Sequence, residues 1–449
     1  MESTKHSSLM SEGNITKHII FFAIPLILSN LLQQLYNTAD SIIVGQFVGS
    51  HALAAISSST AMINLLISFS QGIAIGAGVL VSQYLGANQK ESIRETISTS
   101  IIIALILGLS LSLIGILCTK QLLIWMNTPT EILNDSSTYL MLYFLGLSFN
   151  IMYNMTSGLF NALGKSQLSL YYLGFASITN IVLDLFFIIG LKSGIVGAAI
   201  ATDISQCLSC ILAFHHLTNP QHDYHIQLKK LSYQKSIAIK MIQIGLPTAI
   251  QNMLISLSNL LVQSSVNQFG TQVVAAFGVY MKIDGFNILP ITSLSLAMTT
   301  FTGQNYGAKK YDRIIKGTKI TLALSILYTA LTGILLLTFS HSLLSLFTND
   351  QTVIQCGQLA MQYFCPFYFI LAIMHSLAGS VRGAGKTIPP MIILFISLCL
   401  FRMIWLLFVL PNHHTITTIY ILYPISWSLG AILMMIYTKK SQWLKERSL

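Results

Sequence analysis

Two aspartates embedded in apolar runs are the residues of this chain whose type and position point to chemistry. Asp40 lies near the far end of the run 19–46, and Asp184 lies within the run 168–189. About 20 apolar residues are enough to cross the hydrocarbon core of a bilayer, so each run predicts a membrane-spanning helix. A charged side chain at that depth costs about 2.5 to more than 10 kcal/mol, and it usually faces a bundle interior and marks an ion or substrate path.

Polar residues share a helix face with each of these aspartates. Tyr36 and Asn37 precede Asp40 by four and three positions, and Asn180 precedes Asp184 by four. Residues at these spacings lie on one side of a helix. The pattern predicts two polar faces that each carry a carboxylate. A purely structural role, as hydrogen-bonding groups of separate helices, is the alternative for both.

Two such carboxylates brought together could hold a cation. A carboxyl group out of water binds a proton more readily, and a second carboxylate nearby strengthens that tendency. We expect Asp40 and Asp184 to bind H⁺, or Na⁺, with Tyr36, Asn180 and Thr202 as hydrogen-bond partners. No other metal or organic cofactor is expected.

Other polar residues of the predicted spans are further candidates. Pro25 removes a backbone donor and kinks its helix, so a change in protonation could bend the first span there. Thr202 and Gln206 share a face of the run 195–217, whereas Asp203 points about 100° away from Thr202 and is a third candidate acid. In the second half of the chain, Asp284 could line a substrate cavity.

Two more features of the apolar runs concern substrates and charge. Met62 belongs to a set of methionines that could form an adaptable apolar wall, although methionine at helical spacing is more often core. Arg402 is expected near the end of its span, with its guanidinium reaching the interface. Lys282 could pair with an acid on another helix, or it could only neutralise charge within the bundle.

The composition agrees with a multi-pass membrane protein. The chain has 449 residues, of which 53% are hydrophobic and only 8% are charged, and its mean hydropathy is +0.70. Soluble domains carry about 25% charged residues. The net charge of +10 needs no nucleic-acid partner, because basic residues in cytoplasmic loops produce it. The six cysteines lie in or beside apolar runs and show no disulfide framework.

Window hydropathy predicts twelve membrane spans in two sets of six. The first lobe (18–217) follows a tail (1–17), and a polar linker (218–235) precedes the second lobe (236–438) and a tail (439–449). His222 and His225 of the linker are expected to be solvated. The predicted spans are 19–43, 52–84, 92–117, 132–153, 168–189, 195–217, 236–269, 273–302, 314–339, 353–379, 388–410 and 416–437.

The basic residues predict the orientation. With the N-terminus inside, most loop lysines and arginines, including Lys5, Lys445 and Arg447, fall on the cytoplasmic side. The outer side holds only Lys120 and Lys192. This asymmetry satisfies the positive-inside rule with both termini in the cytoplasm.

The two halves also repeat one another at an offset of about 222 residues. Pro25 in IPLILSN corresponds to Pro247 in LPTAIQN, SQYLGANQK to GQNYGAKKY, and ALGKS to GAGKT. An even number of spans separates the copies, so they enter the membrane from the same side, as in parallel-repeat transporters.

At these residues the chain resembles the multidrug and toxic-compound extrusion (MATE) family, in its bacterial DinF-like branch. The resemblance covers about 15–437 and rests on IPLILSNLLQQLYNTADSIIVGQ, LGANQK, YGAKKYD, SGLFNALGKSQ, AGSVRGAGKT and GAAIATDISQ. It implies an all-α, V-shaped membrane protein with two pseudo-symmetric six-helix lobes. It also implies efflux of amphipathic, often cationic compounds in exchange for H⁺ or Na⁺ by alternating access.

The resemblance implies roles for particular residues. Pro25 matches the bending proline, and Gln34 looks like a substrate contact; Asn37, Met62, Gln206 and Asp284 complete our candidate substrate set. Asp203 departs from the family, which usually has an apolar residue there. The cation-coupling set implied for the first lobe, with Asp203 as our addition, is Tyr36, Asp40, Asn154, Asn180, Asp184, Thr202 and Asp203.

These residues discriminate among three function classes. A multidrug antiporter of a bacterial cytoplasmic membrane is favoured, with organic cations or drugs and membrane lipids as partners and a monomeric state. A lipid or polysaccharide-precursor flippase of the same superfamily is the alternative, although its anionic substrates favour a basic cavity and these spans carry more acids than bases. A membrane enzyme is not expected, because no HExxH or paired aspartate-rich motif is present.

Overall fold

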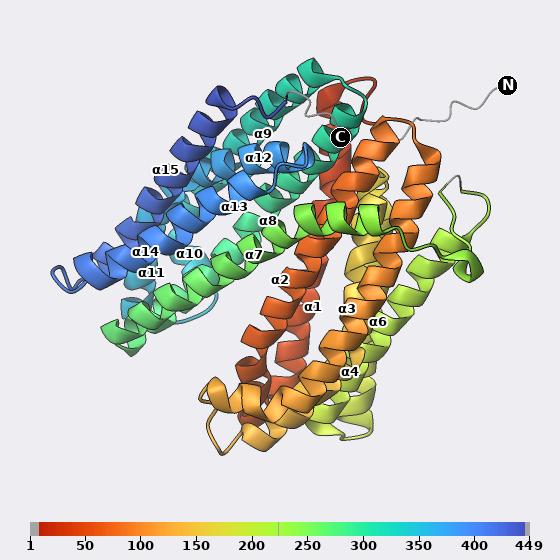
Figure 1. The fold of residues 1–449 in the computed structure, drawn as a ribbon. Coiled ribbons are helices and arrows are strands. Elements are labelled where there is room, and N and C mark those ends of the chain that lie inside the picture. Colours follow the sequence, from red (N-terminus) through yellow and green to blue (C-terminus); the bar gives the residue numbers. More distant parts are fainter. Residues whose placement is uncertain (1–8, 223, 445–449) are drawn as a thin grey trace. The chain divides into compact units, whose positions relative to one another are not determined.

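The chain folds almost entirely into helices, which confirms the predicted all-α class (Figure 1). The computed structural model describes residues 9–222 and 224–444. Lys5, Lys445 and Arg447 of the predicted tails lie outside these residues. In the first half the helices are α1 (Ile15–Phe47), α2 (Ser50–Gly86), α3 (Lys90–Trp125), α4 (Leu133–Ala162), α5 (Ser166–Asp184), the π-helical η1 (Leu185–Gly190) and α6 (Gly194–Thr218).

The second half repeats this order after the short helix η2 (Leu228–Lys230). Helices α2 and α8 each have 37 residues, and α1 and α7 each contain a proline, Pro25 and Pro247. The internal repeat is therefore confirmed. The helices are α7 (Lys235–Val266), η3 (Asn267–Phe269), α8 (Thr271–Gly307), α9 (Tyr311–Thr338), α10 (Ser340–Ser345), α11 (Gln351–Phe364), η4 (Cys365–Phe367), α12 (Tyr368–Gly383), α13 (Ile388–Leu394), η5 (Phe395–Leu400), α14 (Phe401–Ile404), η6 (Trp405–Val409) and α15 (Ile416–Lys440).

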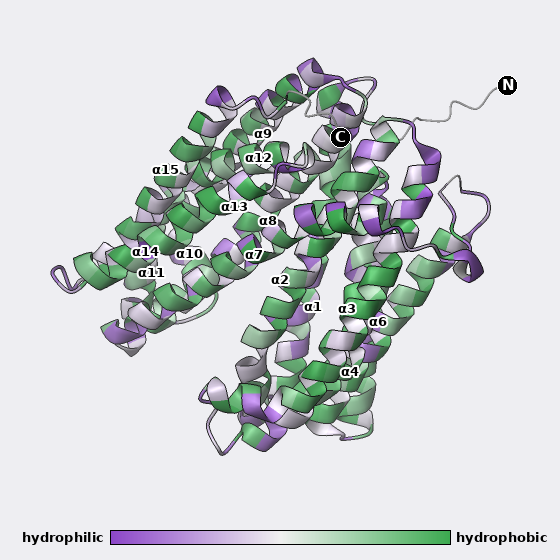
Figure 2. Cartoon of the chain, viewed as in Figure 1, coloured by the Kyte–Doolittle hydropathy of each residue, from purple (hydrophilic) through white to green (hydrophobic). Residues whose placement is uncertain are grey.

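Most of the long helices are apolar enough to cross a membrane. Ten candidate spans are found in the described residues by length and composition. Helices α4 and α7, with 30 and 32 residues, are also of spanning length but carry more polar residues. The green of Figure 2 follows the helices, whereas purple marks the turns and the connection from α6 to α7. The pattern is consistent with the twelve predicted spans.

The chain forms two compact units whose limits do not coincide with the linker. Of the described residues, unit 1 comprises 9, 24–222 and 224–249, and unit 2 comprises 10–23 and 250–444. Helix α1 therefore passes from unit 2 to unit 1 next to Pro25. Helix α7 passes from unit 1 to unit 2 two residues after Pro247.

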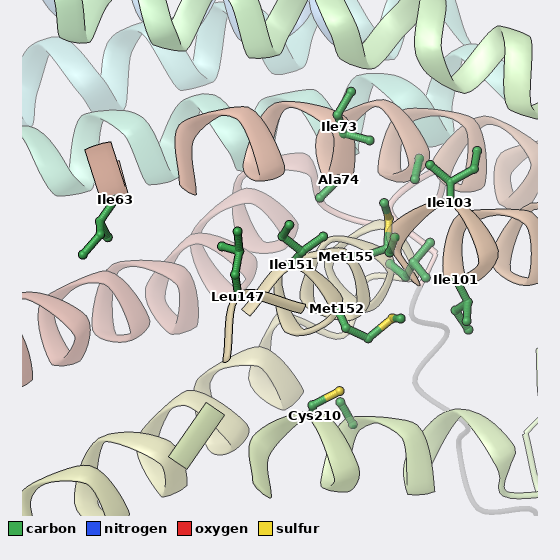
Figure 3. Packing of buried hydrophobic residues seen from close by; sticks show 14 of the residues in the cluster. Ile63, Ile73, Ala74, Ile101, Ile103, Leu147, Ile151, Met152, Met155 and Cys210 are labelled. Atoms are coloured by element: carbon green, nitrogen blue, oxygen red, sulfur yellow. The ribbon is translucent and has the colours of Figure 1, made fainter. Parts of the chain in front are cut away.

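The core of unit 1 is built by α2, α3, α4 and α6. Figure 3 shows Ala74 of α2 on the side of Ile151 and Met155 of α4, with Ile73 on the opposite side of α2, and Cys210 projects from α6. All six cysteines are free, in agreement with the absence of a disulfide framework in the sequence. This core fixes α4 and α6, which carry part of the candidate site.

The linker packs against unit 1 through aromatic side chains. His222 stacks on His216 of α6 with ring centroids 4.4 Å apart, and on Tyr224 at 5.1 Å. The Tyr224 hydroxyl accepts a hydrogen bond from Lys165 Nζ at 2.7 Å. His222 is therefore only partly solvated, because the stacking covers part of its ring.

Candidate functional site

Asp40 of α1 and Asp184 of α5 come together inside unit 1. Their carboxyl groups are close enough to interact directly. Asp184 is completely buried, and it is the last residue of α5 before the π-helical η1 begins. Two carboxylates this close repel each other, so the ionisation of one disfavours the ionisation of the other. The arrangement can therefore hold a proton between α1 and α5.

Asn180 and Thr202 flank this pair as the sequence predicts. Asn180 Nδ2 donates a hydrogen bond to Thr202 Oγ1 at 3.4 Å, and the Thr202 hydroxyl donates to the carbonyl of Ala198 at 3.1 Å. Asn180 is only 2% exposed. The bond links α5 to α6 and holds the amide one turn before Asp184.

The buried oxygen atoms around the pair lack donors. Both carboxylate oxygens of Asp184, Oδ1 of Asp40 and Oδ1 of Asn180 are buried without a hydrogen-bond partner among the described residues, and Oε1 of Gln206 on α6 is also buried without one. Nearly all buried acceptors in proteins have a partner. The four acceptors of Asp40, Asp184 and Asn180 without a donor leave the negative charge of the carboxylates unmatched. Such a set fits a proton, or a cation that takes oxygen ligands such as Na⁺.

Two tyrosines that the sequence reading missed complete the surroundings of the pair. Tyr139 of α4 interacts electrostatically with Asp40, Asp184 and Tyr36, and Tyr143 interacts with Tyr36. Both are buried, at 5% and 7% exposure. Their spacing of four places them on one face of α4, and that spacing in a predicted span was the signal that could have identified them.

Asp203 lies apart from the pair, on the α4 side of α6. A Cβ atom at Gly146 of α4 would overlap the Asp203 carboxylate, so an alanine there would displace that carboxylate. Tyr143 interacts electrostatically with Asp203 as well as with Tyr36. The predicted difference in direction between Thr202 and Asp203 agrees with this placement.

The remaining predicted residues of the first half take different positions. Asn154 donates from Nδ2 to Asn150 Oδ1 at 2.8 Å, and this partner lies on the same helix, α4. Gln34 and Asn37 lie on α1, where Asn37 is exposed and Gln34 is partly buried. Met62 of α2 is partly buried and packs against the core of unit 1, as expected of a core methionine.

In unit 2, Asp284 and Arg402 lie on α8 and α14. Asp284 is partly buried, and its neighbours are the hydroxyls of Tyr280 and Tyr368, which hydrogen-bond each other at 2.9 Å. Arg402 is only 4% exposed, so the expectation that it reaches the interface is wrong. Its Nε donates to Ser426 Oγ at 3.1 Å, because packing against α15 encloses the side chain.

The described residues contain no group of three or more His, Cys, Asp or Glu side chains that could hold a metal ion. Their one ion pair joins His51 and Asp135, at 3.3 Å. Neither Asp40 nor Asp184 therefore forms an ion pair with a basic side chain among the described residues. The unit 1 site offers carboxylate and amide oxygens, which suit H⁺ or Na⁺ and not a transition metal.

A family model agrees with the repeat and with the site. The MatE model matches the chain twice, over residues 25–186 and 247–407. The first match begins at Pro25 and contains Asp40 and Asp184, and the second begins at Pro247. Together the matches cover more than half of the chain.

Relatives of known name and solved structures agree with the family model. The chain is 28% identical over 442 residues to the probable multidrug resistance protein YoeA of Bacillus subtilis, covering 95% of this chain and 94% of that one. It is 27% identical to the probable multidrug resistance protein NorM of Thermotoga maritima, over 86% and 83% of the two chains.

The fold matches a solved structure described as the outward-facing conformation of a multidrug resistance MATE family transporter, with a TM-score of 0.90, 22% identity and 98% coverage of both chains. A structure of MATE in complex with MaL6 gives a TM-score of 0.91 at 21% identity, over 97% and 98% of the chains. At this identity the likeness shows the fold alone. With the repeated family match, it identifies the chain as a multi-pass membrane transporter, and not an enzyme, that belongs to the MATE family of multidrug transporters.

Proposed function

We propose that the protein is a secondary antiporter that exports amphipathic organic cations in exchange for H⁺, with Na⁺ as the second candidate ion. The observation that carries this proposal is the set of four buried acceptor oxygens without donors on Asp40, Asp184 and Asn180. An ionised carboxylate without a partner is too costly inside a membrane protein, so the site is occupied by a cation in most of the cycle.

The same negative charge supports the choice of substrate class. A cationic compound stabilises ionised carboxylates, and a proton neutralises them, so the two occupants compete. The names of the relatives, multidrug resistance proteins, agree with substrates of varied structure. Gln34, Asn37, Met62 and Gln206 are proposed contacts in unit 1, and Asp284 is a proposed contact in unit 2.

The orientation belongs to the same proposal. We place the protein in a bacterial cytoplasmic membrane with both termini in the cytoplasm, because lysines and arginines concentrate in the loops of that side. Export then uses the inward gradient of the coupling ion. Lipids surround the exposed apolar helix faces, and a monomer is sufficient for the cycle.

The test is transport in proteoliposomes. The purified protein is reconstituted, a pH gradient or a Na⁺ gradient is imposed, and the movement of ethidium is followed by its fluorescence. We expect transport under the pH gradient and a loss of at least about ten-fold in Asp40→Asn and in Asp184→Asn, because a neutral amide cannot exchange the proton.

Asp135→Asn is the matched control, because Asp135 is an acid of α4 whose side chain is 49% exposed. It should transport like the parent. Parental activity in both Asp40→Asn and Asp184→Asn would contradict the assignment of the pair. Transport that responds to the Na⁺ gradient alone would show that Na⁺, and not H⁺, is the coupling ion.

A further inference from the structure

The segment that leads into α7 carries several lysines and no acid. Lys229, Lys230, Lys235 and Lys240 follow one another closely, and the range 224–283 contains no aspartate or glutamate. Figure 2 shows the hydrophilic character of this connection from α6 to α7. We call residues 229–246 the α7 entry, and all of them belong to unit 1.

The lysines of the α7 entry are not used to hold the fold. None of their ammonium groups forms an ion pair or a hydrogen bond within the part of the chain that the structure describes. Lys229, Lys230 and Lys235 are exposed, and Lys240 is half-buried. Clustered positive charges without an acid attract anions, and screening limits this attraction to about 8–10 Å at physiological salt. An anionic partner must therefore come close to the α7 entry.

The backbone beneath these lysines is fixed to α3. The Gln234 amide donates to Thr99 Oγ1 at 3.1 Å, and Gln234 Nε2 donates to Glu95 Oε1 at 3.2 Å. The carboxylate of Glu95 is thus bound by an amide and not by a lysine. Ala238 and Met241, in the first turns of α7, are only 1% and 0% exposed. A ligand therefore meets the lysines on a preformed base, and little free energy is lost in ordering the chain.

An apolar stripe continues along α7 from the lysines. Ile239, Ile242 and Leu246 are 45%, 43% and 38% exposed, and their spacing of three and four places them on one face of the helix. Exposed aliphatic side chains of a membrane helix contact acyl chains, because the bilayer core holds no water. Tyr233, which is 54% exposed, precedes the stripe, and tyrosine is enriched at the depth of the headgroups.

The equivalent segment before α1 uses basic residues differently. The Arg313 guanidinium of α9 donates to the carbonyls of Met10 and Gly13 at 3.1 and 3.0 Å, and Lys310 Nζ donates to the Ser11 carbonyl at 3.0 Å. That attachment occupies two bases with contacts inside the protein. The α7 entry is attached through a glutamine, so its own lysines remain available to a partner outside the protein.

We propose that the α7 entry is a binding site for the headgroup of an anionic phospholipid, on the side of the membrane where the linker lies. Lys229, Lys230 and Lys235 contact the headgroup, with Tyr233 at the same depth, and the acyl chains follow the apolar stripe. Lys240 adjoins the stripe, where its long stem can lie along apolar surface while the ammonium reaches the headgroup. Four or more basic residues directly outside a membrane helix are typical of anionic-lipid recognition. The inference goes beyond the proposed antiport and holds for either coupling ion.

The test is lipid binding to the purified full-length protein. Native mass spectrometry counts the phosphatidylglycerol and phosphatidylcholine molecules that the protein retains from neutral detergent micelles, over a series of lipid concentrations. Phosphatidylcholine has the same phosphate but no net charge. We expect the parent to bind phosphatidylglycerol at least about ten-fold more tightly, because each lysine near an anionic headgroup contributes a factor of about five.

The decisive variant combines Lys229→Gln, Lys230→Gln and Lys235→Gln. Its preference for phosphatidylglycerol should fall to about two-fold or less, by the same factor for each lysine. The matched control combines Lys316→Gln, Lys319→Gln and Lys439→Gln, which remove the same charge from exposed positions of α9 and α15. The control should keep the parental preference.

Two outcomes of this comparison would overturn the site. A parental preference in the α7-entry variant would show that its lysines do not contact the lipid. An equal loss in both variants would show that net charge alone decides binding. Glycerol 3-phosphate, added in excess over the lipid, should not displace phosphatidylglycerol, because it lacks acyl chains for the apolar stripe. Displacement would point to a soluble phosphate compound and would overturn the lipid assignment.

A second measurement needs no substitution. The parent is acetylated with an uncharged amine-reactive ester in phosphatidylcholine nanodiscs with and without phosphatidylglycerol, and the modified lysines are located by mass spectrometry. We expect phosphatidylglycerol to slow the acetylation of Lys229, Lys230 and Lys235 at least about three-fold, since a bound headgroup covers their ammonium groups. Lys316 and Lys319 should react at nearly unchanged rates. Equal slowing at both sets of lysines would also overturn the proposal.

Discussion

Asn180 donates its amide hydrogen to the Thr202 hydroxyl, 3.4 Å away, and its own Oδ1 remains buried without a donor. The two residues therefore have unequal roles. The Asn180 oxygen is available to a cation beside Asp184, whereas the Thr202 hydroxyl already donates to the carbonyl of Ala198.

This inequality predicts the effects of two substitutions. Asn180→Leu should raise the coupling-ion concentration for half-maximal transport about ten-fold, because one charge-assisted contact is worth about 1.5 kcal/mol or more. Thr202→Val should raise it about two- to three-fold. Ethidium transport at a series of ion concentrations measures both values. Equal effects of the two substitutions would contradict the assignment of Asn180 as a ligand.

Gly146→Ala should destabilise the protein. The new methyl group would overlap the Asp203 carboxylate, and overpacking of this kind typically costs about 1–3 kcal/mol. Thermal unfolding in detergent measures the change. In Gly146→Ala combined with Asp203→Ala, most of the loss should be recovered, because the overlapping group is gone.

Gly278→Ala is the control for that substitution, since a Cβ at Gly278 of α8 meets nothing within 4 Å. It should be neutral or should stabilise α8 by up to about 1 kcal/mol, the difference in helix propensity. A lower unfolding temperature for Gly278→Ala than for Gly146→Ala would show that contact with Asp203 does not decide the outcome.

Arg402→Lys should lower the free energy of unfolding by about 1–3 kcal/mol, because a lysine cannot keep both hydrogen bonds and the ring contact. Arg402 Nη1 donates to Asn259 Oδ1 at 3.3 Å, and the guanidinium lies 4.4 Å from the centroid of the Tyr423 ring. Denaturant titration in detergent gives the value. Arg94→Lys, at an exposed position of α3, should change the free energy of unfolding little. Equal losses in Arg94→Lys and Arg402→Lys would show that the buried contacts of Arg402 do not stabilise the fold.

The linker should loosen as the pH falls. Burial, with a smaller contribution from Lys165, lowers the pKa of His222 below its ordinary value of about 6.5. The unfolded linker then binds more protons than the packed one, so the stacking on His216 and Tyr224 is fully stable above about pH 6.5 and weakens below it. Exchange of the Ile226 amide, which donates to the Leu217 carbonyl at 3.0 Å, reports this change.

In His222→Phe the ring still stacks but no longer titrates. After correction for intrinsic exchange rates, the Ile226 amide of this variant should lose at least half of its dependence on pH. His216 and Tyr224 remain in the variant and face the same ring. If the pH dependence of Ile226 exchange is unchanged in His222→Phe, the group that titrates is His216 and not His222.

The fold was predictable to a large extent, because a bilayer imposes strong rules on a chain. Apolar runs of spanning length predicted the helices, and the corresponding prolines Pro25 and Pro247 predicted the repeat. Spacing on single helices also predicted which residues share a face, such as Asn180 with Asp184. These are local properties, and each depends on the geometry of one helix.

The surroundings of the site could not be read in the same way. Tyr139 and Tyr143 approach the aspartates from α4, and the glycine at position 146 matters only because Asp203 of α6 lies against it. Arg402 was expected at an interface and is buried, because its partners come from α7 and α15. Contacts between helices depend on rotation and packing, and the hydropathy of one segment contains neither.

The sequence by itself thus determined the all-helical membrane architecture, the duplication and the two aspartates, because solvation in a bilayer and helical periodicity act on each segment separately. Only the tertiary structure decided that Asp40 meets Asp184 among oxygens without donors, and that α1 and α7 are each shared between two units. The physical reason is that charge compensation and close packing arise between segments, once they are placed against one another.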